Sequence, residues 1–304
     1  MIALSTSWKS TDCDNGEALI RAIEQFPISE VELEYRITEP MYQQMRRFLK
    51  NSAPRVISIH NFSPVPPIVP RSMASGDLFL LSHTDREERL QAVQWTVRTI
   101  ECANDLEARA VVLHGGRIDM NPEMEVLKKH LDEGTIDSEE AQDFIREKMA
   151  ERERKKSKHI DALFFSLEKL IAAAERYHIQ LGLENRYGYH ELPGPDEFGE
   201  IFEKFDGAPL YYWHDVGHAQ VNENLGLVNV RTLLETLSEK LIGMHFHDAR
   251  GHEDHLPPGK GEIDFTAVRP YLKEDTLCVL ELYPGTPDEE VSEGLAFLHG
   301  KGIA

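Results

Sequence analysis

Basic residues are scarce in this chain. Its 304 residues include 33 Lys and Arg against 53 Asp and Glu, so the formal net charge is -20 at pH 7. A field of that sign repels polyanions unless basic side chains cluster locally. A nucleic acid is therefore not an expected partner.

Cysteines and long apolar runs are also few. Cys13, Cys102 and Cys278 form no C-x-x-C pair, and any disulfide scheme leaves one of them unpaired, so we interpret them as reduced thiols. The chain has no apolar run of about eighteen residues, the length of a membrane span. Its first residues, MIALSTSWKS, lack the basic and apolar segments of a signal peptide. We expect a cytoplasmic protein without a membrane partner.

Short apolar runs rich in Val, Ile and Leu recur along the chain and predict about eight strands. They cover residues 2–5, 31–35, 56–60, 110–114, 181–184, 210–215, 241–247 and 277–282. Between them, segments such as 85–106 and 158–179 place apolar residues at steps of three and four, as amphipathic helices do. This alternation predicts an α/β fold, a (β/α)8 TIM barrel, in a single domain over residues 1–304.

Residues 117–160 interrupt this alternation after the fourth predicted strand. The segment is long, highly charged and poor in large apolar residues toward its end. We interpret it as a solvated helical insertion; the alternatives are a lid or the arm of a homo-oligomer.

Six consecutive predicted strands end in residue types that bind metals. The strand-end residues are His60, His114, Glu184, Asp215 with His218 three positions later, His245 with His247, and Glu281. One such histidine alone is usually a packing residue, and Glu184 alone could pair with Arg186. Glu281 lies inside the apolar stretch VLELYP, where a charge is costly unless it is paired or bound to a cation. Because the strand ends of a parallel barrel meet at one mouth, their agreement predicts a metal site.

Glu184, Asp215, His245 and Glu281 would supply that site with three carboxylates and one imidazole. Such ligands suit Mn²⁺, Mg²⁺ or Co²⁺, and Zn²⁺ also accepts them. His247 alternates with His245, so we expect it to face away from the metal or to support a ligand.

The motifs LGLENR, WHDVGHAQV, GMHFHDARG, DHLPPGKGEIDF and VLELYP together resemble those of the xylose isomerase-like barrel superfamily. This group contains sugar phosphate isomerases and epimerases as well as endonuclease IV. The resemblance implies that Glu184 and Glu281 bind the metal and exchange a proton with the substrate carbon. It also implies that Asp215 and His245 are metal ligands and that His218 contacts substrate or a metal.

The endonuclease IV branch implies three zinc ions. Its ligand types are met here by His60, His114, Glu184, Asp215, His218, His245, Glu253, His255 and Glu281. That family has an aspartate where Glu253 stands, which changes the reach of the ligand. The acidic net charge also disfavours a duplex partner, whose phosphates bind Lys and Arg.

The leading hypothesis is a metal-dependent isomerase or epimerase of a small sugar or sugar derivative. Glu184 and Glu281 would move the proton through a metal-stabilised enediolate. Substrate contacts are expected from His60, His114, His218, Arg250, His255 and Lys260, and the four histidines could instead bind a further metal. Arg250 or Lys260 would hold a carboxylate or phosphate. The alternatives are an endonuclease IV-like hydrolase, a metal-dependent dehydratase of a hydroxy-acid, and a sugar-binding barrel without catalysis.

Two further features have mainly structural interpretations. PPGKGEIDF is expected to be an ordered loop, in which Asp264 caps the helix that begins near Phe265. The aromatic residues Trp8, Phe62, Trp213 and Tyr283 are either core residues or an apolar wall beside the substrate.

Overall fold

Eight parallel strands close into a barrel in the computed structural model, which describes residues 1–49 and 54–303. The strands are β1 (Ile2–Ser5), β2 (Glu30–Leu33), β3 (Arg55–His60), β4 (Ala110–Leu113), β6 (Gln180–Glu184), β8 (Leu210–Asp215), β9 (Leu241–Phe246) and β12 (Leu277–Leu280). Their order around the barrel is β1-β12-β9-β8-β6-β4-β3-β2, and Ile2 of β1 pairs with Cys278 of β12 to close it. All eight predicted strands and the TIM barrel are confirmed.

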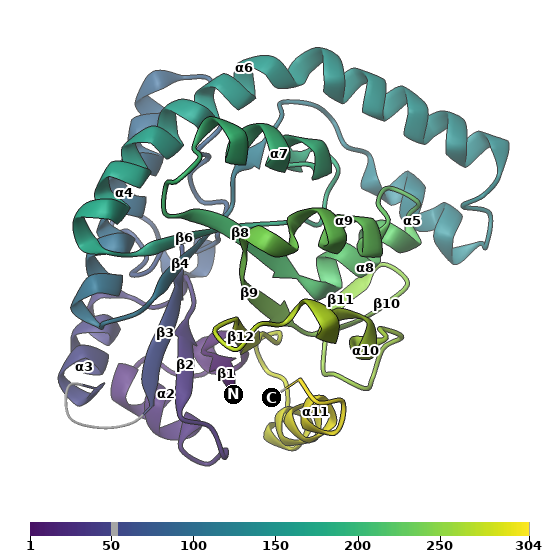
Figure 1. Ribbon diagram of the computed structural model, residues 1–304. Coiled ribbons are helices and arrows are strands. Elements are labelled where there is room, and N and C mark those ends of the chain that lie inside the picture. The colour runs from purple at the N-terminus through teal and green to yellow at the C-terminus, as the bar shows by residue number, and fades with distance from the viewer. Residues whose placement is uncertain (50–53, 304) are drawn as a thin grey trace.

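Helices surround the barrel (Figure 1). They are α1 (Ser7–Ser10), α2 (Gly16–Ile23), α3 (Glu39–Leu49), α4 (Arg86–Asp105), α5 (Met124–Asp132), α6 (Glu139–Tyr177), α7 (Pro195–Lys204), α8 (Val216–Asn224), α9 (Val230–Leu237), α10 (Phe265–Val268) and α11 (Asp288–Gly300). Two hairpins, β5 (Gly116–Arg117) with β7 (Glu191–Leu192) and β10 (Asp248–Arg250) with β11 (Glu253–Leu256), lie outside the barrel sheet. Across the described residues, no helix combines the length and apolar character needed to cross a membrane.

Side-chain caps fix where several helices begin. Asn15, Asp85, Ser138 and Asn229 each accept a backbone N–H of the first helical turn. These bonds satisfy N–H groups that have no partner inside the helix, and each contributes about 1 kcal/mol. Asp264 caps α10 by accepting the Thr266 N–H at 3.0 Å, as the sequence predicts.

Two apolar layers hold the barrel together. The outer layer packs strand residues such as Leu4 and Leu183 against the surrounding helices. The inner layer fills the barrel with Ala3, Ile57, Ala110, Val112, Trp213, Leu277 and Val279. Burying a Leu or Val side chain contributes about 1.5–3 kcal/mol, so both layers stabilise the parallel sheet that carries the strand ends.

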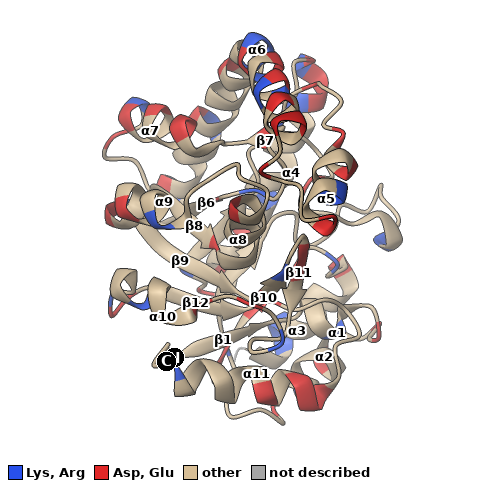
Figure 2. Cartoon of the chain, turned by 90° about the vertical axis from the view of Figure 1, so that its right-hand side faces the viewer, with Lys and Arg blue, Asp and Glu red and all other residues tan. Residues whose placement is uncertain are grey.

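Residues 117–160 contain α5 and the first part of α6. The helix α6 then continues without a break to Tyr177 and covers the barrel, so segment and barrel helix form one element (Figure 1). Charges of both signs are interspersed along α6 (Figure 2). Leu127 of α5 is fully buried with Val221, Leu225 and Ala249, so this segment is packed against the barrel and not simply solvated.

Candidate metal centre

The strand ends bring the four predicted ligands together. Ligand atoms of Glu184, Asp215, His245 and Glu281 all lie within 4.8 Å of one another. Their strands β6, β8, β9 and β12 are successive neighbours in the barrel, with Asp215 paired to His245 in register. All four side chains are buried.

Carboxylates surround the imidazole of His245. Its Nδ1 lies 2.6 Å from Glu184 Oε1 and 3.2 Å from Glu281 Oε2, and its Nε2 lies 3.1 Å from Glu32 Oε1. Burial alone would lower the pKa of His245, but Glu281, Glu32 and Glu184 outweigh it and raise that pKa well above its ordinary value. Burial also raises the pKa of Glu281. Three oxygen donors and one nitrogen in a buried cluster fit a divalent cation, which would relieve this crowding of negative charge.

Sequence reasoning missed Glu32. This carboxylate lies on β2, is fully buried, and accepts a hydrogen bond from Ser58 Oγ at 2.7 Å. The signal was present, because Glu32 stands inside the apolar run VELEY just as Glu281 stands inside VLELYP.

Asp215 is held by protein donors as well as by its strand. Its carboxylate accepts the backbone N–H of His218 at 2.6 Å and a bond from His247 Nε2 at 2.9 Å. His247 Nδ1 accepts the His255 backbone N–H, so its other nitrogen carries the proton. His247 is fully buried, so it does not face outward but supports Asp215.

A second group, His60, His114 and Glu184, shares Glu184 with the first. His114 Nδ1 lies 3.1 Å from Asp77 Oδ1, and its Nε2 lies 2.9 Å from Glu184 Oε2. A carboxylate on the far nitrogen is common behind metal-binding histidines. Arg186 also enters this group, because its Nη1 lies 2.5 Å from His114 Nε2 and 3.0 Å from Glu184 Oε2.

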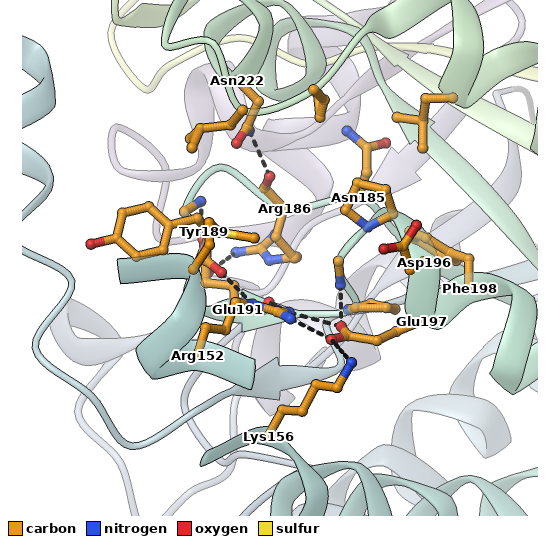
Figure 3. A pocket seen from close by; sticks show the side chains of 18 of the residues that line it. Arg152, Lys156, Asn185, Arg186, Tyr189, Glu191, Asp196, Glu197, Phe198 and Asn222 are labelled. Carbon is orange, nitrogen blue, oxygen red and sulfur yellow. Dashed lines mark hydrogen bonds and ion pairs between the residues drawn. The ribbon is translucent and has the colours of Figure 1, made fainter. Parts of the chain in front are cut away.

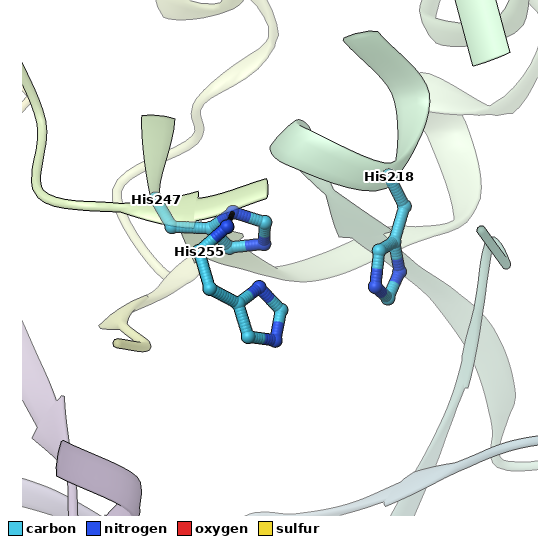
Figure 4. A group of neighbouring side chains, drawn as sticks. All are labelled: His218, His247 and His255. Carbon is cyan, nitrogen blue, oxygen red and sulfur yellow. Dashed lines mark hydrogen bonds between the residues drawn. The ribbon is translucent and has the colours of Figure 1, made fainter. Parts of the chain in front are cut away.

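A third group consists of His218, His247 and His255, which converge in Figure 4. Burial lowers the pKa of His255 to about 3, and its buried Nδ1 has no hydrogen-bond partner among the described residues. A neutral ring with a free nitrogen is what a metal requires of histidine. Glu253 is exposed and stays outside the group, whereas the buried Asp254 lies 3.6 Å from His218.

The two predicted anion-binding residues have other partners. Arg250 donates to the backbone oxygen of Lys260, and Lys260 Nζ lies 2.9 Å from Glu293 of α11. Asp248 accepts the backbone N–H groups of Ala249, Gly259 and Ile263. The loop PPGKGEIDF is therefore held as a structured element, as its sequence predicts.

The aromatic residues divide between core and site. Trp8, Phe62 and Trp213 are buried core residues, whereas Tyr283 is 52% exposed and lines a pocket beside the third group. Trp213 also stacks edge-on against His245, with 5.1 Å between ring centroids.

A cavity of about 110 Å³ lies beside α6, α7 and α8, and Arg186 is among the residues that line it (Figure 3). Its polar wall is the buried ion pair between Arg152 and Glu197, with Lys156 4.0 Å from the same carboxylate. Arg152 also donates to the backbone oxygens of Tyr189 and Glu191, so these charges tie α6 to the loop after β6.

Comparison with known proteins agrees with this architecture. Residues 20–300 match the family model of the xylose isomerase-like TIM barrel. The chain belongs to this family. Among solved structures, a D-tagatose 3-epimerase-like protein superimposes with a TM-score of 0.70 at 19% identity, covering 99% of this chain and 97% of that one. The 3-keto-D-glucoside 4-epimerase of E. coli gives 0.68 at 15% identity, covering 98% of each chain.

Two further comparisons concern a zinc-bound solved structure and a relative in sequence. The zinc-bound IolI protein superimposes with a TM-score of 0.60 at 13% identity, covering 99% of this chain and 96% of that one. An uncharacterised protein from Methanocaldococcus jannaschii is 33% identical over 121 residues, 39% of this chain. The match spans only 41% of that relative's length.

Proposed function

We propose that this family member is a metal-dependent isomerase or epimerase of a small sugar or sugar derivative. The observation that carries the proposal is the buried group of Glu184, Asp215, His245 and Glu281 at the strand ends. Several structural neighbours are named as sugar epimerases, including an L-ribulose 3-epimerase and a D-psicose 3-epimerase, which supports the same substrate class.

In this proposal Glu184 and Glu281 transfer the proton. Glu184 ends β6 and Glu281 follows β12, with β8 and β9 between those strands, and both carboxylates reach His245. A divalent cation bound here would act as a Lewis acid toward the oxygen on which charge develops. One glutamate removes the carbon-bound proton; the other returns it, on the opposite face in an epimerisation.

Deuterium exchange tests this chemistry. In D₂O with Mn²⁺, the protein should incorporate deuterium at a carbon next to the carbonyl of at least one member of a sugar panel. Glu184→Gln and Glu281→Gln should each slow exchange by about 10²–10⁴-fold, the usual contribution of a general acid or base. Glu274→Gln, on an exposed turn, is the control and should exchange at the wild-type rate. No exchange with any sugar would refute the proposal, and loss of water in the product would indicate a dehydratase.

The three ligand groups favour one second candidate, a phosphodiester hydrolase with three metals. Besides His247, whose two ring nitrogens are already hydrogen-bonded, they comprise His60, His114, Glu184, Asp215, His218, His245, His255 and Glu281. Efficient incision of abasic duplex DNA by the zinc-loaded protein would establish this function. The net charge of -20 and the guanidinium of Arg186 inside one of the groups favour the sugar enzyme instead.

A further inference from the structure

A pocket of about 590 Å³ opens beside the third histidine group. The residues that line it are Lys128, Tyr187, His252, Glu253, Asp254, Leu256 and Tyr283. They come from α5, the loop after β6, the hairpin β10–β11 and the turn after β12. Figures 1 and 2 both place α5 next to that hairpin. The segment 117–160 therefore supplies part of the wall.

Three residues that line the pocket contact histidines of the third group. Asp254 Oδ2 lies 3.6 Å from His218 Nε2, and Tyr283 donates its hydroxyl to Asp254 Oδ1 at 2.8 Å. The rings of Tyr283 and His255 are 4.8 Å apart between centroids, and those of Tyr187 and His218 are 6.1 Å apart. A ligand held at the strand ends can thus extend along Tyr187 and Tyr283.

Lys128 lies over the ring of Tyr187. Its Nζ lies 5.6 Å from the centre of that ring, and 23% of its side chain is exposed. Its carboxylate partner, Glu125 at 2.9 Å, is 84% exposed, and such surface pairs are worth little. A ligand anion can therefore replace Glu125. Of the described residues that line the pocket, Lys128 alone carries a permanent positive charge.

Packing fixes the position of α5, the helix that carries Lys128. The neighbouring Leu127 is fully buried under α5, and His252 Nε2 lies 3.3 Å from Asp132 at the end of the helix. Tyr187 donates its hydroxyl to the His252 backbone oxygen at 2.8 Å. These contacts hold α5 and Tyr187 together as one wall.

The other charged residues in or near the pocket are less suited than Lys128 to bind an anion. Asp254 is already engaged by Tyr283 and His218, and Glu253 is exposed. Arg250 and Lys260 have the partners described above and do not line the pocket.

We propose that Lys128 binds the far end of the substrate, and that this end carries a carboxylate or a phosphate. The identity of the ligand as a sugar derivative rests on the proposed function. The helix α5 would then set substrate specificity, because it adds a cation to a mouth whose other charges are mostly acidic.

Calorimetric titration tests the contact without measuring catalysis. The ligands are ribulose, ribulose 5-phosphate and ribonate, each added to the Mn²⁺-loaded protein. Lys128→Met should weaken binding of a charged ligand at least tenfold and leave the affinity for ribulose unchanged. Lys129→Met is the matched control, because Lys129 is the next residue of α5 and its side chain is 73% exposed. It should bind all three ligands as wild type does, and thermal unfolding should show both variants folded.

Several results would overturn the proposal. One is that wild type and Lys128→Met bind the charged ligands with equal affinity. Another is that Lys128→Met loses as much affinity for ribulose as for the charged ligands. The third is that the wild type binds neither charged ligand more tightly than ribulose. Raising the salt concentration should weaken the binding of charged ligands to wild type more than their binding to Lys128→Met. Charge-dependent binding through Lys128 without deuterium exchange would refute the proposed catalysis and leave the Lys128 contact standing.

Discussion

Arg186 is a buried cation inside the second ligand group. Its guanidinium lies 3.0 Å from Glu184 Oε2, 3.0 Å from Asp77 Oδ2 and 2.9 Å from Glu191 Oε1, with only 7% of its side chain exposed. Its Nη1 also lies 2.5 Å from the His114 nitrogen that faces Glu184. A metal between His114 and Glu184 would need the same lone pairs, so Arg186 and a metal ion would compete for the second ligand group.

Replacing Arg186 should therefore change metal stoichiometry. We expect Arg186→Gln to bind one more equivalent of Zn²⁺ than wild type, because the lone pairs of His114 and Glu184 become free. The free energy of unfolding should fall by about 3–5 kcal/mol, since Asp77 and Glu191 lose their buried partner. Elemental analysis after dialysis against Zn²⁺ measures the first effect and urea unfolding the second. The control is Arg117→Gln, which removes an exposed arginine. Equal zinc content in folded Arg186→Gln and wild type would contradict the competition.

For single residues, the sequence could predict some positions of the site and not others. Glu184 and Asp215 were found because each ends an apolar strand, and parallel strands share an edge. The partner of Lys260 could not be found in this way, because Glu293 lies on a helix remote in sequence and only loop geometry brings the two together. Whether Glu253 or Asp254 faces the histidines also depends on the twist of a short hairpin, which residue type does not reveal.

At the scale of elements, α6 joins the charged segment to the barrel. No Gly or Pro occurs between Glu139 and Tyr177, so nothing in the sequence ends the helix. The sequence predicts helices on both sides of residue 158, but their fusion and their docking depend on contacts with distant loops. One contact is His159, which is 4% exposed; its Nδ1 lies 3.0 Å from the Ser82 oxygen, and its Nε2 accepts the Asp119 N–H at 3.2 Å.

His159 should make docking of α6 sensitive to acid. Burial lowers its pKa below the ordinary 6.5, so the unfolded chain takes up a proton at a higher pH than the folded chain. Its stabilising contribution is present above about pH 6.5 and is lost as the pH falls toward the folded pKa. Urea unfolding should show wild type losing more stability than His159→Gln between about pH 7.5 and about pH 5.5. His299→Gln, at an exposed position of α11, should follow wild type. Equal losses of stability in wild type and His159→Gln over this pH range would refute this prediction.

At the scale of the whole molecule, the barrel closes around Trp213. The eight strands and their closure follow from the pattern of apolar runs, but the filling of the interior depends on register. Trp213 pairs with Gly243 on the next strand, and its ring lies where side chains of Gly182 and Gly243 would otherwise stand. The same ring contacts His245 from the side, so interior packing and the position of His245 are linked.

Adding a methyl group at Gly243 should test this link. An alanine Cβ there would lie 2.2 Å from Trp213 Cζ3, so the ring or the strand must move. We expect Gly243→Ala to lower the free energy of unfolding by about 1–3 kcal/mol, as overpacked cores do. Gly199→Ala, on α7 with nothing within 4 Å of the added atom, should be neutral or stabilising by up to about 1 kcal/mol.

A double variant separates overpacking from other effects of the substitution. Trp213→Phe removes the atoms that the new methyl group meets, so Gly243→Ala should cost less in the Trp213→Phe background than in wild type. Urea unfolding of the four proteins gives this coupling. If the losses in the free energy of unfolding are additive, Gly243 is required for its backbone conformation and not for the space that it leaves to Trp213.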